Sequence, residues 1–155
     1  MLDPMAAPLG RPVPEQGAVL AFDYGLRRTG VAVGELALCI AHPVATIDTT
    51  DRAQRIVCVE SLVAEWRPVL FVVGMPMRDD GKEHLLAPAV RKFGGQLHGR
   101  FGLPVVYVDE TLSSNAAERA LAEAGIRGAR RKAVLDQAAA REILQSFFEM
   151  RHACA

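Results

Sequence analysis

The chain has 155 residues, half of them hydrophobic, and its 18 basic and 18 acidic residues leave a formal net charge of zero. This length and composition suit one compact domain with a substantial core. A neutral chain is not expected to coat nucleic acid through bulk charge, so any such contact should come from a local basic patch. No apolar run approaches the roughly 20 residues that a membrane helix needs, so we expect no membrane partner.

Both ends of the chain are predicted to be tails. Residues 1–17 hold four of the nine prolines and lack an apolar segment after a basic start, which favours a flexible tail over a signal peptide. Residues 18–150 are expected to form the single domain, and residues 151–155 a short C-terminal tail. Three widely spaced cysteines without a Cys-x-x-Cys pair indicate reduced thiols in a cytoplasmic protein.

The first predicted element is a β-hairpin over residues 19–33. An apolar run ends at Asp23, a turn over 25–30 carries Arg27 and Arg28, and a second apolar run follows. Because side chains alternate along a strand, Asp23 shares a face with residues that point into the core. A carboxylate there needs a cation, hydrogen bonds or water. The alternative is an Asp that only bonds backbone N–H groups of the turn.

Strands and helices then alternate along the chain. The predicted elements, in order, are a third strand over 36–47 interrupted by Pro43, an amphipathic helix over 51–66, a buried strand over 69–73, a turn-rich loop over 74–81, a helix over 82–101 whose regular part starts near Ala87, a strand over 103–108, a helix over 116–124 capped by Asn115, a loop over 125–132, and a last helix from Ala133. Short turns join the first three strands into an antiparallel meander. The two later strands are apolar throughout, which is typical of parallel central positions in an α/β sheet.

Acidic residues at three places in the chain are candidates for a catalytic or metal-binding site. Asp23 and the Asp109-Glu110 pair end strands, and Asp136 lies four residues before Ala140 on the inward face of the last helix. Asp136 alone could equally be a first-turn acid that complements the helix dipole. If the two strands are neighbours the carboxylates converge, and such a cluster must protonate, separate or hold a cation. Mg²⁺ or Mn²⁺ suits an all-carboxylate site, and paired ions about 3.5 to 4 Å apart promote phosphodiester hydrolysis.

Fifteen of the 18 basic residues are arginine, which suits bidentate phosphate contact. They cluster at Arg27 and Arg28, and again with Lys132 at Arg130 and Arg131 in the late loop. Either cluster could bind nucleic acid, and either could simply be a solvated surface.

Four segments together resemble the successive motifs of the YqgF family. They are the hairpin at 22–33, the loop at 73–81, the segment at 108–114 and the helix start at 135–139, in the family's order. The family is similar to the RuvC-type Holliday junction resolvases and has the ribonuclease H-like fold. That fold is a five-stranded mixed sheet, an antiparallel meander plus two parallel strands, flanked by helices. Family members are described as Holliday junction resolvases and as nucleases that mature the 5′ end of 16S ribosomal RNA.

The resemblance implies that Asp23, Glu110 and Asp136 are catalytic acids that hold one or two Mg²⁺ or Mn²⁺ ions. Glu110 rather than Asp109 is then the inward residue of its pair, since Val106, Val108 and Glu110 share a face of the strand.

The family's basic pair corresponds to Arg27 and Arg28, for which it implies phosphate contact, and the Arg130 to Lys132 cluster is expected to position the nucleic-acid backbone. The chain departs from the family pattern at Thr29 and at Gly34-Glu35. These departures touch the turn and the second strand rather than the acids.

We therefore expect a metal-dependent endonuclease that acts in 5′-end maturation of 16S ribosomal RNA. The alternatives are a Holliday junction resolvase and a non-catalytic nucleic-acid-binding or ribosome-assembly factor. A sugar kinase or actin-like ATPase would need a second domain, and Val31 follows the glycine turn where a P-loop requires Lys. The sequence contains no heptad pattern that would indicate a coiled-coil dimer, so we expect a monomer or a weak homodimer.

Overall fold

The computed structural model describes residues 13–78, 80–110 and 128–151, with only the backbone for 128–131. The elements are β1 (Ala18–Asp23), β2 (Arg28–Glu35), β3 (Ile40–Asp48), α1 (Arg52–Trp66), β4 (Pro68–Met75), α2 (Ala87–Phe101), β5 (Val105–Asp109) and α4 (Gly128–Arg151). The predicted tail residues 1–12 and 152–155 and the predicted helix over 116–124 lie outside the described residues. Within the described parts, no helix is long and apolar enough to cross a membrane.

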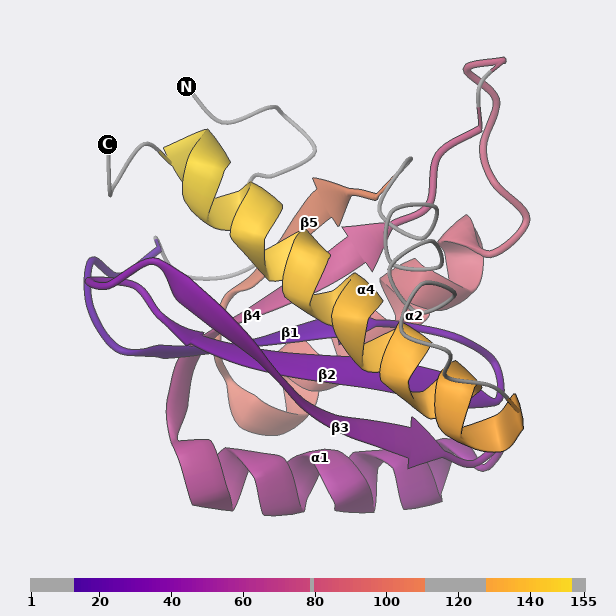
Figure 1. The fold of residues 1–155 in the computed structure, drawn as a ribbon, viewed down its shortest axis with the longest axis horizontal. Helices are drawn as coiled ribbons and strands as arrows, with labels where there is room; N and C mark the ends of the chain where they lie inside the picture. Colours follow the sequence, from indigo (N-terminus) through magenta and orange to yellow (C-terminus); the bar gives the residue numbers. More distant parts are fainter. Residues whose placement is uncertain (1–12, 79, 111–127, 152–155) are drawn as a thin grey trace.

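The strands form one five-stranded sheet in the order β3-β2-β1-β4-β5. The pairs β1-β2 and β2-β3 are antiparallel, and β1-β4 and β4-β5 are parallel. The predicted mixed sheet is thus confirmed, with the meander on one side and the two parallel strands on the other (Figure 1). Because β1, β3, β4 and β5 run the same way, their carboxyl ends meet at one edge of the sheet.

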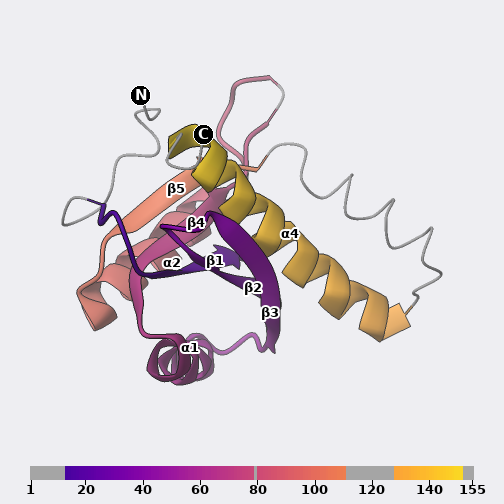
Figure 2. The same cartoon turned by 60° about the vertical axis from the view of Figure 1, so that its left-hand side comes forward.

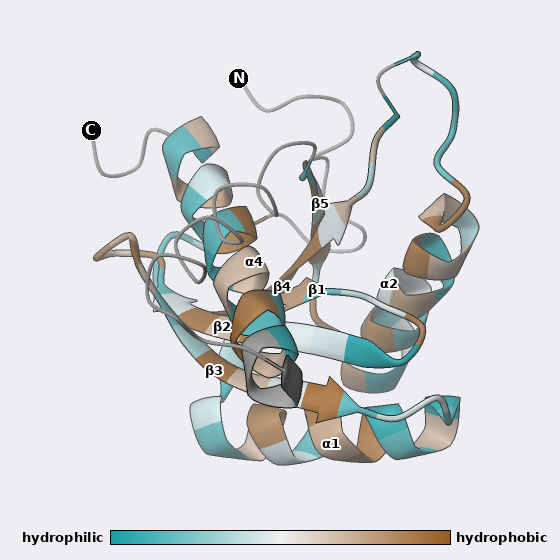
Figure 3. Ribbon diagram, turned by 45° about the vertical axis from the view of Figure 1, so that its right-hand side comes forward, coloured by the Kyte–Doolittle hydropathy of each residue, from teal (hydrophilic) through white to brown (hydrophobic). Residues whose placement is uncertain are grey.

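Helices cover both faces of this sheet, α4 on one side and α1 with α2 on the other (Figure 2). Alternation along β1 divides its side chains between the two faces. Ala21 packs in the α4 layer with Phe147, whereas Phe22 contacts Phe93 of α2 with ring centroids 5.4 Å apart. Asp23 therefore points to the α4 side of the sheet and Tyr24 to the other side. Figure 3 shows that the loop between β4 and α2 is mostly hydrophilic.

The boundaries of α1 and α2 follow from their capping residues. Asp51 accepts hydrogen bonds from the backbone N–H groups of Ala53 and Gln54, which fixes the start of α1 as predicted. Arg67 ends that helix in the left-handed conformation, with φ of 48°. Pro88 lies in the first turn of α2, where its missing N–H costs nothing, so the regular helix does start at Ala87.

Two predictions about local structure are wrong. The loop expected over 125–132 is helical from Gly128 onward, because the Ala, Arg and Lys residues that follow are strong helix formers. Cys39 is disulfide-bonded and Cys58 is a free thiol, so the prediction of reduced thiols fails at Cys39.

Glycines in β2 let α4 approach the sheet closely. Gly30 was expected in the hairpin turn but lies inside the strand, where a Cβ atom would be 1.9 Å from the backbone oxygen of Asp136. At Gly34 a Cβ atom would be 2.9 Å from the ring of Phe148. Glycine inside a strand is typical of such close backbone approach. These contacts set the distance between α4 and the sheet, and hence the position of Asp136.

Replacing Gly30 with Ala should displace α4 and lower the free energy of unfolding by about 1 to 3 kcal/mol, as overpacking of a close contact does. The matched control is Gly95→Ala on α2, where a Cβ atom meets nothing within 4 Å. That change should stabilise the protein by up to about 1 kcal/mol, because Ala is the better helix former. Urea unfolding of both variants measures the difference; equal stabilities would contradict the proposed close contact.

Candidate active site

Asp23 ends the central strand, with β2 on one side and β4 on the other. It pairs with Gly30 of β2 across the antiparallel ladder, and its side chain points into the α4 layer at the carboxyl edge of the sheet. Burial raises the pKa of Asp23 to about 6, the charge of Asp136 adds to that rise, and a hydrogen bond with Glu110 opposes it. Burial acts in this direction because it disfavours the ionised form of a carboxyl group.

Glu110 directly follows β5, and its side chain reaches across β4 to Asp23. Its backbone N–H donates to the carbonyl of Met75 at 3.4 Å, and its carboxyl group hydrogen-bonds to that of Asp23. The path passes over Gly74, where a Cβ atom would lie 2.7 Å from Glu110 Oε2. Asp109 is exposed, so Glu110 is the inward residue of the pair, as expected.

The two carboxyl groups share one proton in the absence of a cation. Burial raises the pKa of Glu110 to about 9, and the nearby charge of Asp23 adds to the rise. Both shifts favour a protonated pair, in which one carboxyl group donates the hydrogen bond that joins the two. Carboxylate oxygens are the ligands that Mg²⁺ and Mn²⁺ prefer, and a divalent ion could replace the shared proton. The pair therefore fits such an ion chemically.

Asp136 lies beside this pair but is bound to an arginine. Its Oδ2 atom accepts a hydrogen bond from Arg28 Nε at 3.1 Å, and both side chains are mostly buried. Burial raises the pKa of Asp136, while the Arg28 charge opposes the rise. Because α4 begins at Gly128, Asp136 is beyond the first turn, so the dipole explanation for it is wrong.

The three acids are thus near one another without forming a complete ligand set. Among the residues that the structure describes, no group of three or more His, Cys, Asp or Glu side chains is arranged to hold a metal ion. Asp23 and Glu110 are in contact, whereas Asp136 points to Arg28.

The predicted basic residues gather at the same edge of the sheet. Arg27 is exposed and lies 3.4 Å from Asp48, an exposed ion pair of a kind that contributes little to stability. Thr46 near the end of β3 donates to the carbonyl of Ala133 at 2.8 Å, which places the start of α4 beside these strands. Lys132 is exposed there. The side chains of Arg130 and Arg131 lie outside the described residues, although both are helical rather than in a loop.

The sequence prediction missed the role of Gly74, whose absent side chain opens the path from Glu110 to Asp23. A glycine near the end of an otherwise apolar strand was the available signal. The two departures from the family pattern have structural roles. Thr29 is fully buried, and Glu35 Oε1 accepts hydrogen bonds from the N–H groups of Gly17 and Ala37.

Comparison with known proteins gives consistent results. Residues 17–150 match the model of the RuvX family, described as "Holliday junction resolvase". A relative from Methylobacillus flagellatus, named "Putative pre-16S rRNA nuclease", is 49% identical over 134 residues, which are 86% of this chain and 92% of that protein. A relative of the same name from Nitrosospira multiformis is 46% identical over 140 residues, 90% of this chain and 93% of that protein.

A solved structure shares the fold. "T. thermophilus RuvC in complex with Holliday junction substrate" superposes with a TM-score of 0.54 at 18% identity, covering 90% of this chain and 98% of that chain. The likeness confirms the predicted ribonuclease H-like fold.

The carboxyl pair predicts how stability depends on pH when divalent ions are absent. The pKa values of Asp23 and Glu110 rise from 3.8 to about 6 and from 4.5 to about 9 on folding, so the folded state holds more protons over this range. Stability should therefore fall as pH rises from about 5 to about 9. Glu110→Gln should flatten the fall, and Glu65→Gln on the exposed side of α1 should not. Thermal melting in EDTA across this range is the measurement; identical profiles for wild type and Glu110→Gln would contradict the buried pair.

Proposed function

Because the chain belongs to the RuvX (YqgF) family, we propose that it is a divalent-metal-dependent endonuclease that hydrolyses phosphodiester bonds. The observation that carries the proposal is the contact between the carboxyl groups of Asp23 and Glu110 at the carboxyl edge of the sheet. Open α/β sheets place their ligands at this edge. Two buried acids that share a proton are a costly arrangement unless a cation takes the proton's place.

Asp23, Glu110 and Asp136 would hold the metal. Divalent ions in such a site supply an activated water nucleophile and stabilise the oxygen that leaves the phosphorus. Asp23 and Glu110 provide the oxygen ligands and, once deprotonated, the negative charge that retains the cation. Asp136 completes the set when its carboxylate turns from Arg28, which lies 3.1 Å away, toward the pair.

The arginines of the hairpin would hold the substrate. Arg28 is less available to bind a phosphate group while it is paired with Asp136, and it is released for that contact when Asp136 binds metal. Arg27 is exposed and its pair with Asp48 is loose, so a phosphate group can replace the Asp48 carboxylate at little cost. Lys132, and with it Arg130 and Arg131 on the first turns of α4, would extend this basic edge along the nucleic-acid backbone.

For the substrate we propose precursor 16S ribosomal RNA, cut during maturation of its 5′ end. The names of the relatives from Methylobacillus and Nitrosospira support this choice, since they are nearly half identical to this chain over most of its length. The second candidate is a four-way DNA junction, supported by the description of the family and by the fold shared with RuvC.

Asp23→Asn removes one ligand charge and should lower cleavage by about 100-fold or more while binding is kept. Labelled precursor 16S RNA and a synthetic four-way junction should be tested side by side with Mg²⁺ or Mn²⁺. Glu149→Gln, an exposed acid near the other end of α4, is the control and should cut like wild type.

The substrate that wild type cuts, and Asp23→Asn does not, identifies the activity. Binding of either nucleic acid in EDTA together with no cutting under any metal would instead favour a non-catalytic binding factor.

Metal binding can also be measured without substrate. Saturating Mn²⁺, at about 100 times its dissociation constant, should stabilise wild type by about 2.7 kcal/mol and raise its melting temperature by about 5 to 10 °C. The Asp23→Asn, Glu110→Gln double variant should show no such shift. An equal shift in both proteins would place the metal elsewhere.

A further inference from the structure

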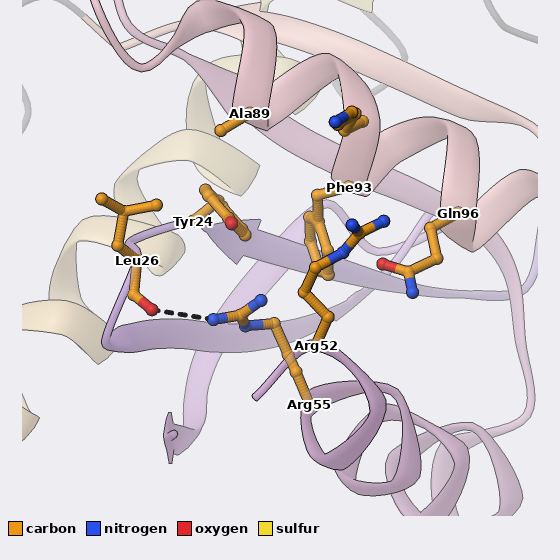
Figure 4. Close-up of a pocket in the computed structure, with 8 residues that line it drawn as sticks. Tyr24, Leu26, Arg52, Arg55, Ala89, Phe93 and Gln96 are labelled. Carbon is orange, nitrogen blue, oxygen red and sulfur yellow. Dashed lines mark hydrogen bonds between the residues drawn. The ribbon is translucent and has the colours of Figure 1, made fainter. Parts of the chain in front are cut away.

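A cavity lies on the opposite face of the sheet from the acids. It measures about 200 Å³ and is bounded by α1, α2 and the turn after β1 (Figure 4). Arg52 and Arg55 line it from α1, and Lys92 lines it from α2. None of its lining residues is acidic, and none of these three cations forms a salt bridge within the described part of the chain. The cavity therefore concentrates positive charge without a compensating acid.

Arg55 is the central cation of this cavity and is only 2% exposed. Its Nη2 atom donates to the carbonyl oxygens of Leu26 at 2.9 Å and Thr49 at 3.0 Å, while its enclosed Nε atom has no acceptor among the described residues. The two carbonyls fix the guanidinium in place but leave its charge without a counterion. A buried charge is unfavourable unless it is paired, so an anion that enters the cavity would stabilise this group.

An aromatic ring packs against the guanidinium. Arg55 Cζ lies 5.0 Å from the centroid of the Tyr24 ring, and Tyr24 in turn contacts Phe93 at 5.0 Å between centroids. Figure 4 shows Tyr24, Arg52 and Phe93 around one hollow. These rings make part of the wall apolar, and a lower local dielectric constant strengthens the attraction between the cations and any anion that enters.

The size of the cavity limits its ligand. It is smaller than the roughly 300 to 1,000 Å³ of pockets that enclose a whole small molecule, so it suits one phosphate group that belongs to a larger molecule. Arginine forms paired hydrogen bonds with phosphate, and Lys92 adds a point charge.

The cavity and the acids lie at the same edge of the sheet. Tyr24 directly follows Asp23, and the two side chains point to opposite faces. A strand of nucleic acid that crosses the end of β1 can therefore contact both.

From this placement we propose that the cavity binds a backbone phosphate of the nucleic-acid strand beside the cleavage position. Arg52 and Lys92 contact the phosphate, and buried Arg55 supplies its counter-charge. The proposal rests on the proposed function, because the ligand is the substrate strand.

The test uses full-length protein carrying Asp23→Asn, so that the nucleic acid stays intact. Fluorescence anisotropy gives the affinity for labelled single-stranded RNA and for a four-way junction over a series of KCl concentrations. Arg52→Gln, Lys92→Gln and their double variant are compared with Arg67→Gln, an exposed arginine at the far end of the same helix. Arg55 is left unchanged because its bonds to two loop carbonyls make loss of folding a competing explanation.

The double variant should bind about 10-fold more weakly, and the slope of log affinity against log salt should fall by about one. Arg67→Gln should match the parent protein. Equal affinity and slope in the double variant would overturn the proposal. A second result would also overturn the proposal. If adenosine 5′-monophosphate shifts the backbone amide signals of Arg52 and Ala89, and the double variant keeps the parent's affinity for RNA, then the ligand is a free nucleotide.

Cleavage by protein with Asp23 intact separates this proposal from the nuclease proposal. Cutting with the same KM in wild type and in the double variant would overturn the phosphate site alone. Binding that depends on the cavity, without cutting under any metal, would overturn the nuclease and leave the phosphate site supported.

Discussion

Two buried carboxyl groups in contact are the constraint around which this molecule is arranged. Asp23 and Glu110 come from strands separated by β4, and they meet only because Gly74 has no side chain in the path. Both pKa values are raised, chiefly by burial; the charge of Asp136 adds to the rise at Asp23, and the charge of Asp23 adds to the rise at Glu110. The fold therefore holds an unfavourable charge arrangement at the edge where the parallel strands end. A bound divalent cation would stabilise the ionised forms of both carboxyl groups, and the pair would therefore bind it. This is the physical link between the fold and a metal-dependent hydrolysis.

Helix α4 and Arg28 determine the position and the ion pairing of Asp136, the third acid of the site. Gly30 lets the backbone of α4 approach β2 at Asp136, and Arg28 then neutralises that carboxylate at 3.1 Å. Arg28 would compete with the proposed metal site for Asp136, so metal binding and substrate binding would be coupled through Arg28. On the opposite face, Tyr24 packs against Arg55, which is buried without a salt bridge to any acid that the structure describes.

Alternation and apolar runs were sufficient to predict the order of most elements and the inward orientation of Asp23. The five-stranded mixed sheet and the choice of Glu110 over Asp109 followed from the resemblance to the YqgF family. The start of α4 was misplaced because the basic residues before Ala133 look like a loop but are good helix formers. The pairing of Arg28 with Asp136 joins residues 108 positions apart, and no local pattern encodes it. The cavity near Arg55 was missed for the same reason, since it combines a turn with faces of two helices.

The most direct test of the proposed metal site is anomalous diffraction from a crystal soaked in Mn²⁺ at a pH above 7. We expect a manganese peak between the carboxyl groups of Asp23 and Glu110, with at least one oxygen of each at a bonding distance of about 2.1 to 2.2 Å. Asp136 should then have moved from Arg28 toward the ion. A map with no peak there, and with the two carboxyl groups still hydrogen-bonded to each other, would contradict the claim that this pair exists to hold a metal.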